Sequence, residues 1–426
     1  MLKRKITDEL IKWKKNSNKL ALLIKGANQV GKSTSIKEFA KKYYNNVVVV
    51  DFIEQPEATI AFEGKLDADT IIRTLSVIGY GPFVEGETLV FFDEIQMCPN
   101  ARTAIKYLVL DRRYDYIEAG SLLEANDKEK RSLPIGFEQT IEMFPLDFEE
   151  YLWAKIAGEG IPQYIKSCYK NLIPVDEFEH NRIMKYFREY MYTGGMPRIV
   201  DASLVNNDFA AVIKEQRILI ENYRVDISNH AGREKTLAMS MFDALPLQLA
   251  KILKISNSTS SNKYRAAAQC LVDAGVAYQC FQLAAPDFPL PAQEKSNLYK
   301  LYLFDTGLLV SRMTDDISRA IFFDDLGTVE KRITENAVAV ALRQSGKFLY
   351  YYDKNSLEID FCFIKNNKIT IIVVKSDKEH KNHTALDKAA AEFGDKLDRR
   401  IVLSKNNVEV SSNGVIYLPL YMTMFL

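Results

Sequence analysis

Residues 26–33 carry glycines, a lysine and a serine at a spacing that can hold phosphate. They read GANQVGKS and match the pattern G-x-x-x-x-G-K-[ST], between an apolar run that ends at Lys25 and a helical run that starts at Ser33. Glycines let the backbone curl so that N–H groups and the helix N-terminus face a phosphate. A glycine-containing turn without a ligand is the alternative, and the strand-loop-helix context argues against it.

The residues expected to contact the phosphates of a nucleotide lie in this loop and in the first helical turn after it. They are Gly26, Asn28, Gln29, Val30, Gly31, Lys32, Ser33 and Thr34. We expect Lys32 to reach the β- and γ-phosphates and the Ser33 hydroxyl to ligate Mg²⁺.

Two carboxylates, Asp93 and Glu94, follow the apolar run TLVFF at residues 88–92. At the carboxyl end of a buried strand, Asp93 can hold the Mg²⁺ water shell and Glu94 can polarise an attacking water. A solvated strand end is the other interpretation of such a pair. Its place after a phosphate-binding loop favours hydrolysis over passive nucleotide storage. Ser121, at the end of the next apolar run, either orients the γ-phosphate or the water, or simply caps a helix.

Five strand-like runs must position these residues. They span residues 19–25, 46–52, 88–92, 114–119 and 139–143. Helical stretches separate them, and the β-branched run at 46–52 suits a strand buried on both faces. The pattern predicts an α/β layer with a parallel sheet.

The pattern changes after residue 145. Residues 146–235 are mainly helical with a break at Gly194 and Gly195, and residues 240–285 have the outline of a winged helix. The last hundred residues return to mixed α/β, with a helix at 328–344 and strands at 347–352, 358–364, 368–375 and 400–404. We therefore predict a multidomain α/β protein with domains at 1–145, 146–235, 236–320 and 321–426.

Global composition limits the partners and the compartment. Lys plus Arg equals Asp plus Glu at 56 each, so a nucleic-acid partner would need a local basic surface. The five cysteines lack zinc-ligand spacing, which is typical of a reduced cytoplasmic protein. The longest apolar runs are strand-sized and the N-terminus lacks a hydrophobic signal core, so we expect neither secretion nor membrane spanning.

Six segments occur in an order that resembles a known family. They are GANQVGKST, LVFFDEIQ, EAGSLLE, MFPLDFEEYL, GGMP and LYLFDTGLL. Over essentially its whole length, the chain resembles prokaryotic AAA-type P-loop ATPases that carry a C-terminal domain of unknown function. The resemblance implies a P-loop core with strand order 5-1-4-3-2, a helical lid, a winged helix and a restriction-endonuclease-like terminal domain.

The resemblance extends to STAND-type signalling ATPases, in which a G-x-P motif on the lid touches the nucleotide base. Gly195-Met196-Pro197 matches that motif, which makes Pro197 a candidate adenine contact. From the residues alone, the segment is only a helix stop followed by a restart.

Two departures from the family pattern concern the nucleotide site. Ala27-Asn28 stands where members often have Pro-Arg, which should change loop chemistry but keep the phosphate cradle. Phe137 stands where many members have an arginine that can act on a neighbour's nucleotide. Arg131 is nearby, but nothing assigns it that role.

The terminal domain offers an incomplete nuclease site. Nucleases of the restriction-endonuclease-like fold use an early Glu, a strand Asp and a Glu-x-Lys pair to gather Mg²⁺. Glu335, Asp360 and Lys375 match three of these positions, but Val373 replaces the second Glu. We predict a degenerate domain kept for packing or recognition, and we expect Val373→Glu to rebuild the ligand set.

Residues 256–273 could form the recognition helix of the winged helix. Ser, Asn, Lys and Arg at its start suit phosphate and base-edge contacts, although they also suit an ordinary helix cap or a protein contact. The histidines show no metal spacing beyond His380-x-x-His383, and we expect them on a solvated surface.

Together these residues predict an ATP- and Mg²⁺-dependent switch ATPase that couples nucleotide state to DNA, to a protein partner or to self-association. ATP is preferred to GTP because no N/T-K-x-D guanine motif stands where a GTPase needs it. The alternative is a winged-helix DNA-binding adaptor with a slow or vestigial ATPase. A third class, an ATP-regulated DNA nuclease, depends on the degenerate terminal site.

Overall fold

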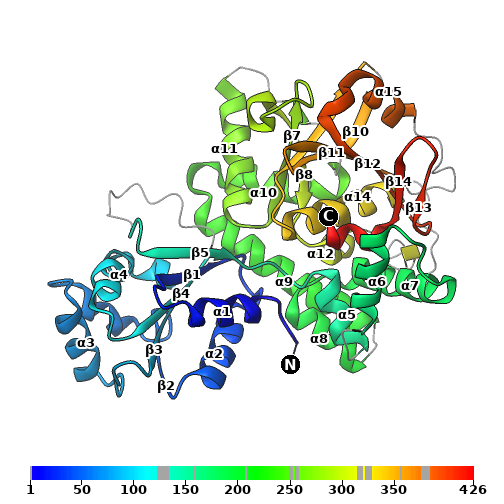
Figure 1. Ribbon diagram of the computed structural model, residues 1–426. Helices are drawn as coiled ribbons and strands as arrows, with labels where there is room; N and C mark the ends of the chain where they lie inside the picture. Colours follow the sequence, from blue (N-terminus) through cyan, green and yellow to red (C-terminus); the bar gives the residue numbers. More distant parts are fainter. Residues whose placement is uncertain are drawn as a thin grey trace. The chain divides into compact units, whose positions relative to one another are not determined.

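The computed structural model of the protein (Figure 1) describes residues 2–121, 134–156, 160–206, 209–248, 253–254, 259–313, 320–321, 329–355, 357–375 and 384–426. The chain divides into two compact units. One contains residues 3–145 together with 273–275, and the other contains residues 146–272 and 276–426.

The first unit is a five-stranded parallel sheet with helices on its two faces (Figure 1). Its strands are β1 Ala21–Lys25, β2 Asn46–Asp51, β3 Thr88–Asp93, β4 Asp115–Gly120 and β5 Glu138–Glu142. Its helices are α1 Ile6–Lys15, α2 Lys32–Tyr43, α3 Ala68–Val77 and α4 Pro99–Asp111, with 3-10 turns η1 Pro56–Phe62 and η2 Ile95–Met97. The strand order is β2-β3-β4-β1-β5, as the resemblance implies.

Burial on both faces explains why these runs form a parallel sheet. Every residue of β3 is buried, and Val50 and Phe92 belong to an apolar cluster with residues of η1, α3 and α4. Helix α2 contacts β3 and β4 outside that cluster. Because both sheet faces are covered, β1, β2 and β3 are almost uninterrupted apolar runs, whereas the edge strand β5 is largely polar and exposed.

The second unit begins with helices and continues into a mixed sheet. Its helices are α5 Phe148–Ile156, α6 Gly160–Asn171, α7 Glu177–Thr193, α8 Pro197–Asn206, α9 Phe209–His230, α10 Lys235–Gln248, α11 Thr259–Asp273, α12 Thr306–Ser311, α14 Glu330–Gln344 and α15 Thr384–Phe393. Its strands are β6 Leu253–Lys254, β7 Ala277–Leu283, β8 Glu294–Leu303, β9 Leu349–Lys354, β10 Leu357–Lys365, β11 Lys368–Val374, β12 Leu397–Ser404, β13 Glu409–Val410 and β14 Val415–Pro419. Its 3-10 turns are η4 Gly232–Glu234, η5 Leu290–Gln293, η7 Gly394–Lys396 and η8 Leu420–Phe425.

The sheet of the second unit has nine strands in the order β13-β14-β12-β11-β10-β9-β7-β8-β6. Strand β7 pairs with β8 antiparallel and with β9 parallel, so the sheet is continuous between residues 253 and 419. The predicted winged-helix and terminal domains therefore share one sheet, and their boundary at 320/321 stays a prediction. None of the helices in the described ranges is long and apolar enough to cross a membrane.

Candidate functional site

The loop between β1 and α2 has the backbone that its glycines predict. Gln29 and Gly31 have φ values of 63° and 95°, and Gly31 immediately precedes the first residue of α2. A Cβ on Gly26 would lie 2.3 Å from the carbonyl oxygen of Met143, so only glycine fits there. Asn28 is half-buried, whereas Gln29 and Thr34 are exposed. The unpaired N–H groups of the first turn of α2 begin at this loop, which is the arrangement that binds anions.

The ammonium group of Lys32 lies inside the loop. Lys32 is only 6% exposed, and its Nζ donates hydrogen bonds of 3.0 Å to the carbonyl oxygens of Gly26 and Ala27. Burial lowers the pKa of Lys32, while Glu94 and Asp93 act to raise it. A phosphate in the loop would compete with the two carbonyls for this cation, because a charged acceptor makes the stronger hydrogen bond.

Ser33 and Asp93 come together across the sheet edge. The Ser33 hydroxyl donates a 2.8 Å hydrogen bond to Asp93 Oδ1, and Lys37 Nζ lies 3.7 Å from Oδ2. Burial raises the pKa of Asp93, although the Ser33 hydrogen bond opposes this shift. A hydroxyl and a carboxylate are hard oxygen ligands, and a nearby divalent cation would stabilise the charged carboxylate. This pair therefore fits Mg²⁺.

Glu94 and Ser121 complete this edge of the sheet. Glu94 has a left-handed backbone with a φ of 53°, uncommon for a residue other than glycine. Its Oε2 accepts a 2.5 Å hydrogen bond from Gln96. Ser121 is buried directly after β4, which lies between β3 and β1 in the sheet. The carboxyl ends of these three strands thus carry the loop, the carboxylates and Ser121.

Arg4 is part of this region, and no sequence pattern pointed to it. Its guanidinium donates to the carbonyl oxygens of Val30 in the loop, at 2.8 Å, and of Phe144 after β5, at 2.7 Å. The sequence shows only an arginine just before an amphipathic helix. That pattern is too common to predict a role for Arg4.

The Gly194–Gly195 pair packs closely against Asp305 within the second unit. Asp305 Oδ2 accepts a 2.6 Å hydrogen bond from the Gly195 amide, and Oδ1 accepts one of 2.9 Å from Leu308 at the start of α12. Burial raises the pKa of Asp305 to about 6 in spite of these donors. A Cβ on Gly195 would lie 2.1 Å from the carbonyl oxygen of Leu146.

The close contact with Asp305 and Leu146 gives the glycines of the GGMP segment a packing role. Pro197 is half-buried at the first position of α8, where its fixed φ suits a helix start. Its predicted contact with adenine stays a prediction.

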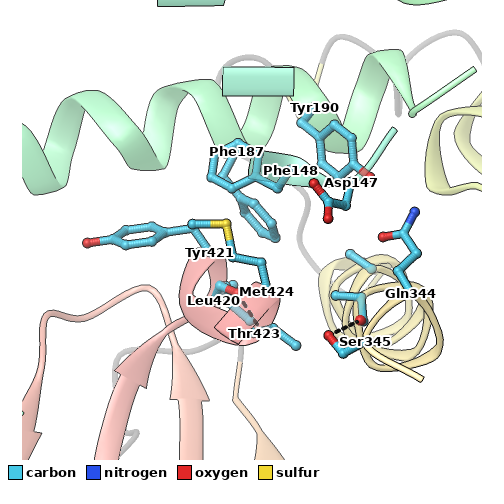
Figure 2. Close-up of a pocket in the computed structure, with 12 residues that line it drawn as sticks. Asp147, Phe148, Phe187, Tyr190, Gln344, Ser345, Leu420, Tyr421, Thr423 and Met424 are labelled. Carbon is cyan, nitrogen blue, oxygen red and sulfur yellow. Dashed lines mark hydrogen bonds between the residues drawn. The ribbon is translucent and has the colours of Figure 1, made fainter. Parts of the chain in front are cut away.

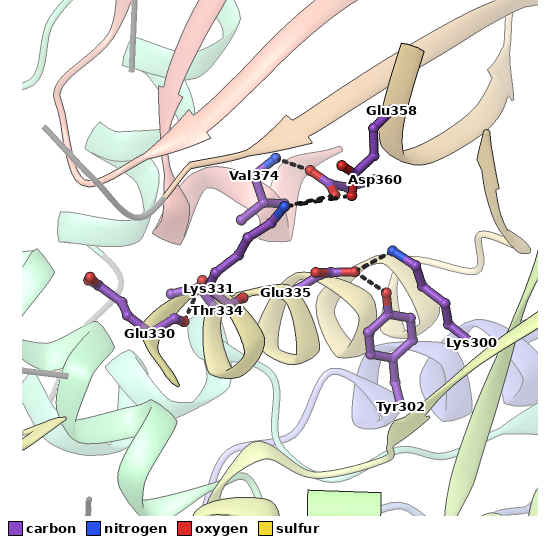
Figure 3. Close-up of polar contacts among 9 residues, drawn as sticks. All are labelled: Lys300, Tyr302, Glu330, Lys331, Thr334, Glu335, Glu358, Asp360 and Val374. Carbon is purple, nitrogen blue, oxygen red and sulfur yellow. Dashed lines mark hydrogen bonds and ion pairs between the residues drawn. The ribbon is translucent and has the colours of Figure 1, made fainter. Parts of the chain in front are cut away.

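Glu335 and Asp360 meet in the second unit, together with two lysines (Figure 3). Lys300 Nζ donates a 2.9 Å hydrogen bond to Glu335 Oε1, which also accepts the Tyr302 hydroxyl. Asp360 Oδ2 accepts a 2.7 Å bond from the Val374 amide, and Lys331 Nζ lies 3.8 Å from Oδ1. Burial lowers the pKa of Lys300, but attraction to Glu335 and Asp360 outweighs it and raises the pKa above its ordinary value. Cationic side chains therefore compensate both carboxylates.

Val373 and Lys375 flank Val374 at the end of β11. Val373 belongs to an apolar cluster that includes Leu386 and Ala389 of α15. Its neighbour Val374 is the residue whose amide meets Asp360. The antiparallel register of β10 and β11 pairs Phe361 with Ile372, so position 373 lies close to Asp360 along the sheet. The expectation that Val373→Glu rebuilds a ligand set stays a prediction. Lys375 lies just beyond the end of β11. Among the described residues, no group of three or more His, Cys, Asp or Glu side chains could hold a metal ion.

Helix α11 carries an exposed basic stretch. Lys263, Tyr264 and Arg265 are exposed near its start, and the antiparallel strands β7 and β8 follow it. Residues 256–258 lie outside the described residues, as do Arg131, His380 and His383.

The histidine expectation was wrong for His180. This side chain is buried, and its ring nitrogens lie 3.0 Å from the Tyr421 hydroxyl and from the carbonyl oxygen of Lys405. It is a core residue.

A pocket of the second unit (Figure 2) lies among α5, α7, α14 and η8. Phe148, Phe187 and Tyr190 supply much of its wall, with Asp147 and Gln344 as polar members. It offers space for little more than one water molecule, too little for a nucleotide.

Three family models match consecutive parts of the chain. Residues 18–152 match an AAA domain. They contain the P-loop, the acidic strand end and the whole five-stranded sheet. Because most of this stretch lies in the first compact unit, we call that unit the AAA domain, after the model that it matches.

The segments after the AAA domain match two domains of unknown function, DUF8612 at residues 184–316 and DUF4143 at residues 330–422. The AAA domain and the C-terminal domain of unknown function agree with the resemblance found in the sequence. The STAND relation, the winged helix and the restriction-endonuclease-like assignment stay predictions. No curated protein matches the chain.

Solved structures share only distant similarity with the chain. The Thermotoga maritima RuvB Holliday junction branch migration motor is 12% identical, with 70% of this chain and 92% of that one covered and a TM-score of 0.30. The Aeropyrum pernix Orc1 protein in complex with DNA is 8% identical, with 76% and 91% covered and a TM-score of 0.27. PCH-2 of C. elegans is 12% identical, with 50% and 69% covered and a TM-score of 0.30. Similarity at this level carries no statement about function.

We expect the wild-type protein to cleave neither duplex nor single-stranded DNA when Mg²⁺ is supplied. Lys300 and Lys331 already compensate Glu335 and Asp360, and Mg²⁺ demands near-ideal octahedral oxygen geometry. A gel assay with purified protein and Asp360→Ala as control checks this. Cleavage that disappears in Asp360→Ala would contradict the prediction, whereas cleavage that persists there identifies a contaminant.

Proposed function

We propose that this protein is a Mg²⁺-dependent ATPase that acts as a nucleotide-controlled switch. The single observation that carries the proposal is the Ser33–Asp93 hydrogen bond beside the buried Lys32 ammonium. It joins the two halves of a phosphoryl-transfer site that are far apart in the sequence.

Each candidate site residue of the AAA domain has a role in this proposal. The loop amides and Lys32 bind the phosphates, Ser33 and Asp93 hold Mg²⁺, and Glu94 orients the attacking water and accepts its proton. Bound Mg²⁺ supplies charge neutralisation at the phosphates. Ser121 adds a polar group at the same edge. The preference for ATP over GTP rests on the sequence, because no guanine-binding motif accompanies the P-loop.

Glu94→Gln should bind ATP with nearly wild-type affinity and hydrolyse it about 100-fold more slowly. The amide keeps the size of the side chain but cannot accept a proton, and general bases contribute about 10²–10⁴-fold. Dissociation constants and single-turnover rates separate the two effects. Glu87→Gln is the matched control, because this exposed carboxylate immediately precedes the same strand. Unchanged turnover in Glu94→Gln would remove Glu94 from the mechanism.

A second candidate is a DNA-binding adaptor whose slow ATPase works as a timer. The exposed Lys263, Tyr264 and Arg265 on α11 favour it, because cationic and aromatic side chains on a helix suit phosphate and base contacts. An ATPase assay with and without duplex DNA separates the two functions. Negligible turnover that rises sharply with DNA, and that falls again in Lys263→Ala/Arg265→Ala, would favour the adaptor.

A further inference from the structure

Arg4 bridges two backbone segments of the AAA domain that are far apart in the sequence. The side chain is buried, and Nη1 and Nη2 donate to the carbonyl oxygens of Val30 and Phe144. Val30 lies in the P-loop and Phe144 follows β5. A guanidinium presents N–H groups in a rigid fork and can hold two carbonyls at once, whereas an ammonium is a single flexible point.

The segment that contains Phe144 also contacts the beginning of the P-loop. The Met143 amide donates a 2.6 Å hydrogen bond to the carbonyl oxygen of Lys25, the last residue of β1. The Met143 carbonyl occupies the space that a side chain at Gly26 would need. Residues 143–144 are thus attached to the loop at its entry, through Lys25 and Gly26, and near its exit, through Arg4 and Val30.

We expect phosphate binding to change the hydrogen bonding of Gly26, which packs against Met143. Lys32 donates to the Gly26 carbonyl, and a phosphate would compete for the same ammonium. Gly26 is packed directly against Met143. Two residues after Met143 the AAA domain ends, and the chain enters the second compact unit at Leu146.

We propose that Arg4 is a positioning residue that fastens the P-loop to residues 143–144, so that nucleotide binding is transmitted to the chain where it leaves the AAA domain. The proposal rests on the proposed function, since it needs nucleotide in the P-loop. It differs from a purely structural role, in which Arg4 would only hold the N-terminus onto the domain. A structural role predicts lower stability without a change in the response of residues 143–146 to ATP.

The test compares the full-length wild type with Arg4→Met and Arg4→Lys. Affinity for ATP is measured in the presence of Mg²⁺, and hydrogen exchange of the peptide covering residues 141–150 is followed with and without saturating ATP. We expect ATP to change exchange at the Met143 amide in the wild type. Arg4→Met should bind ATP about 10-fold more weakly, which is the effect of losing one charge-assisted hydrogen bond. Its Met143 amide should show no ATP-dependent change in exchange, even at saturating ATP. Arg4→Lys should keep part of both.

Arg102→Met is the matched control. Arg102 is a partly buried arginine of the same domain, and it pairs with Glu138 on β5 at 3.2 Å. The control should keep wild-type affinity and the wild-type exchange response. Arg4→Met with wild-type affinity and response would overturn the proposal, as would an ATP-insensitive peptide in a wild type that binds ATP. A wild type that binds no ATP would instead contradict the proposed function. If Arg4→Met does not fold, an Arg4→Lys protein identical to wild type in both measurements also overturns the proposal.

Discussion

Lys32→Ala should lower the affinity for ATP by about 100-fold or more, the loss expected when charge-assisted hydrogen bonds worth about 3 kcal/mol disappear. Lys32 is the buried cation of the P-loop, and Asp93 and Glu94 both act on its pKa. Without its ammonium, the phosphates of ATP would meet these carboxylates with less compensating charge. Equilibrium titration with a fluorescent ATP analogue, in the presence of Mg²⁺, measures the effect.

Lys41→Ala is the control for this substitution. Lys41 is exposed near the end of the same helix α2, so its removal changes helix charge without touching the loop. We expect its affinity for ATP to stay within about 3-fold of wild type, since exposed charges are worth about 0–1 kcal/mol. Tight ATP binding by Lys32→Ala would refute the assignment of the P-loop as the nucleotide site.

Lys300→Met should destabilise the second unit by about 3–5 kcal/mol, the usual cost of removing one partner of a buried ion pair. Lys300 and Glu335 are almost fully buried, at 4% and 2% exposure, and their charged atoms are 2.9 Å apart. The substitution leaves the Glu335 carboxylate with the Tyr302 hydroxyl but without its cation. Hydrogen exchange of the peptide covering α14, followed over a urea series, reports the change in local unfolding free energy.

Two further variants make the interpretation of Lys300→Met specific. Lys300→Met/Glu335→Leu removes both charges and should recover much of the lost stability, because an apolar pair can replace a buried ion pair. Lys331→Met removes a half-exposed lysine near Asp360 and should cost about 1 kcal/mol or less. A double variant no more stable than Lys300→Met would show that Lys300 does not act by compensating Glu335.

Two lysines distinguish the Glu335 and Asp360 cluster from the site of a magnesium nuclease. In such a site, carboxylates gather around a divalent cation that is supplied from solution. Here Lys300 and Lys331 bring the positive charge on the chain itself, from β8 and from α14. We therefore expect this cluster to act on stability, as a structural ion network.

Local sequence patterns were enough to predict the strands of the first unit. Each of its five strands was predicted to within about two residues, the margin by which boundary assignments themselves differ. The P-loop and Asp93 were assigned from local patterns. These patterns are readable because a strand buried on both faces needs a continuous apolar run, and a phosphate loop needs glycines at fixed positions. Neither requirement depends on a distant partner.

Strand pairing in the second unit was only partly predictable. Strands β9 to β12 were found, whereas β8, Glu294–Leu303, and β14, Val415–Pro419, were missed. The first half of β8 is polar and partly exposed, so it has no strong apolar pattern. Its strand conformation depends on pairing with β7 and β6.

Contacts between residues far apart in the sequence could not be predicted from local patterns. Arg4 donates to the carbonyl oxygens of Val30 and Phe144, and the Gly195 amide donates to Asp305. In each case the contact depends on which polar groups the folded chain brings together. A buried polar group without a hydrogen-bond partner is costly, so the fold favours these pairs. A sequence pattern describes only residues that are close along the chain.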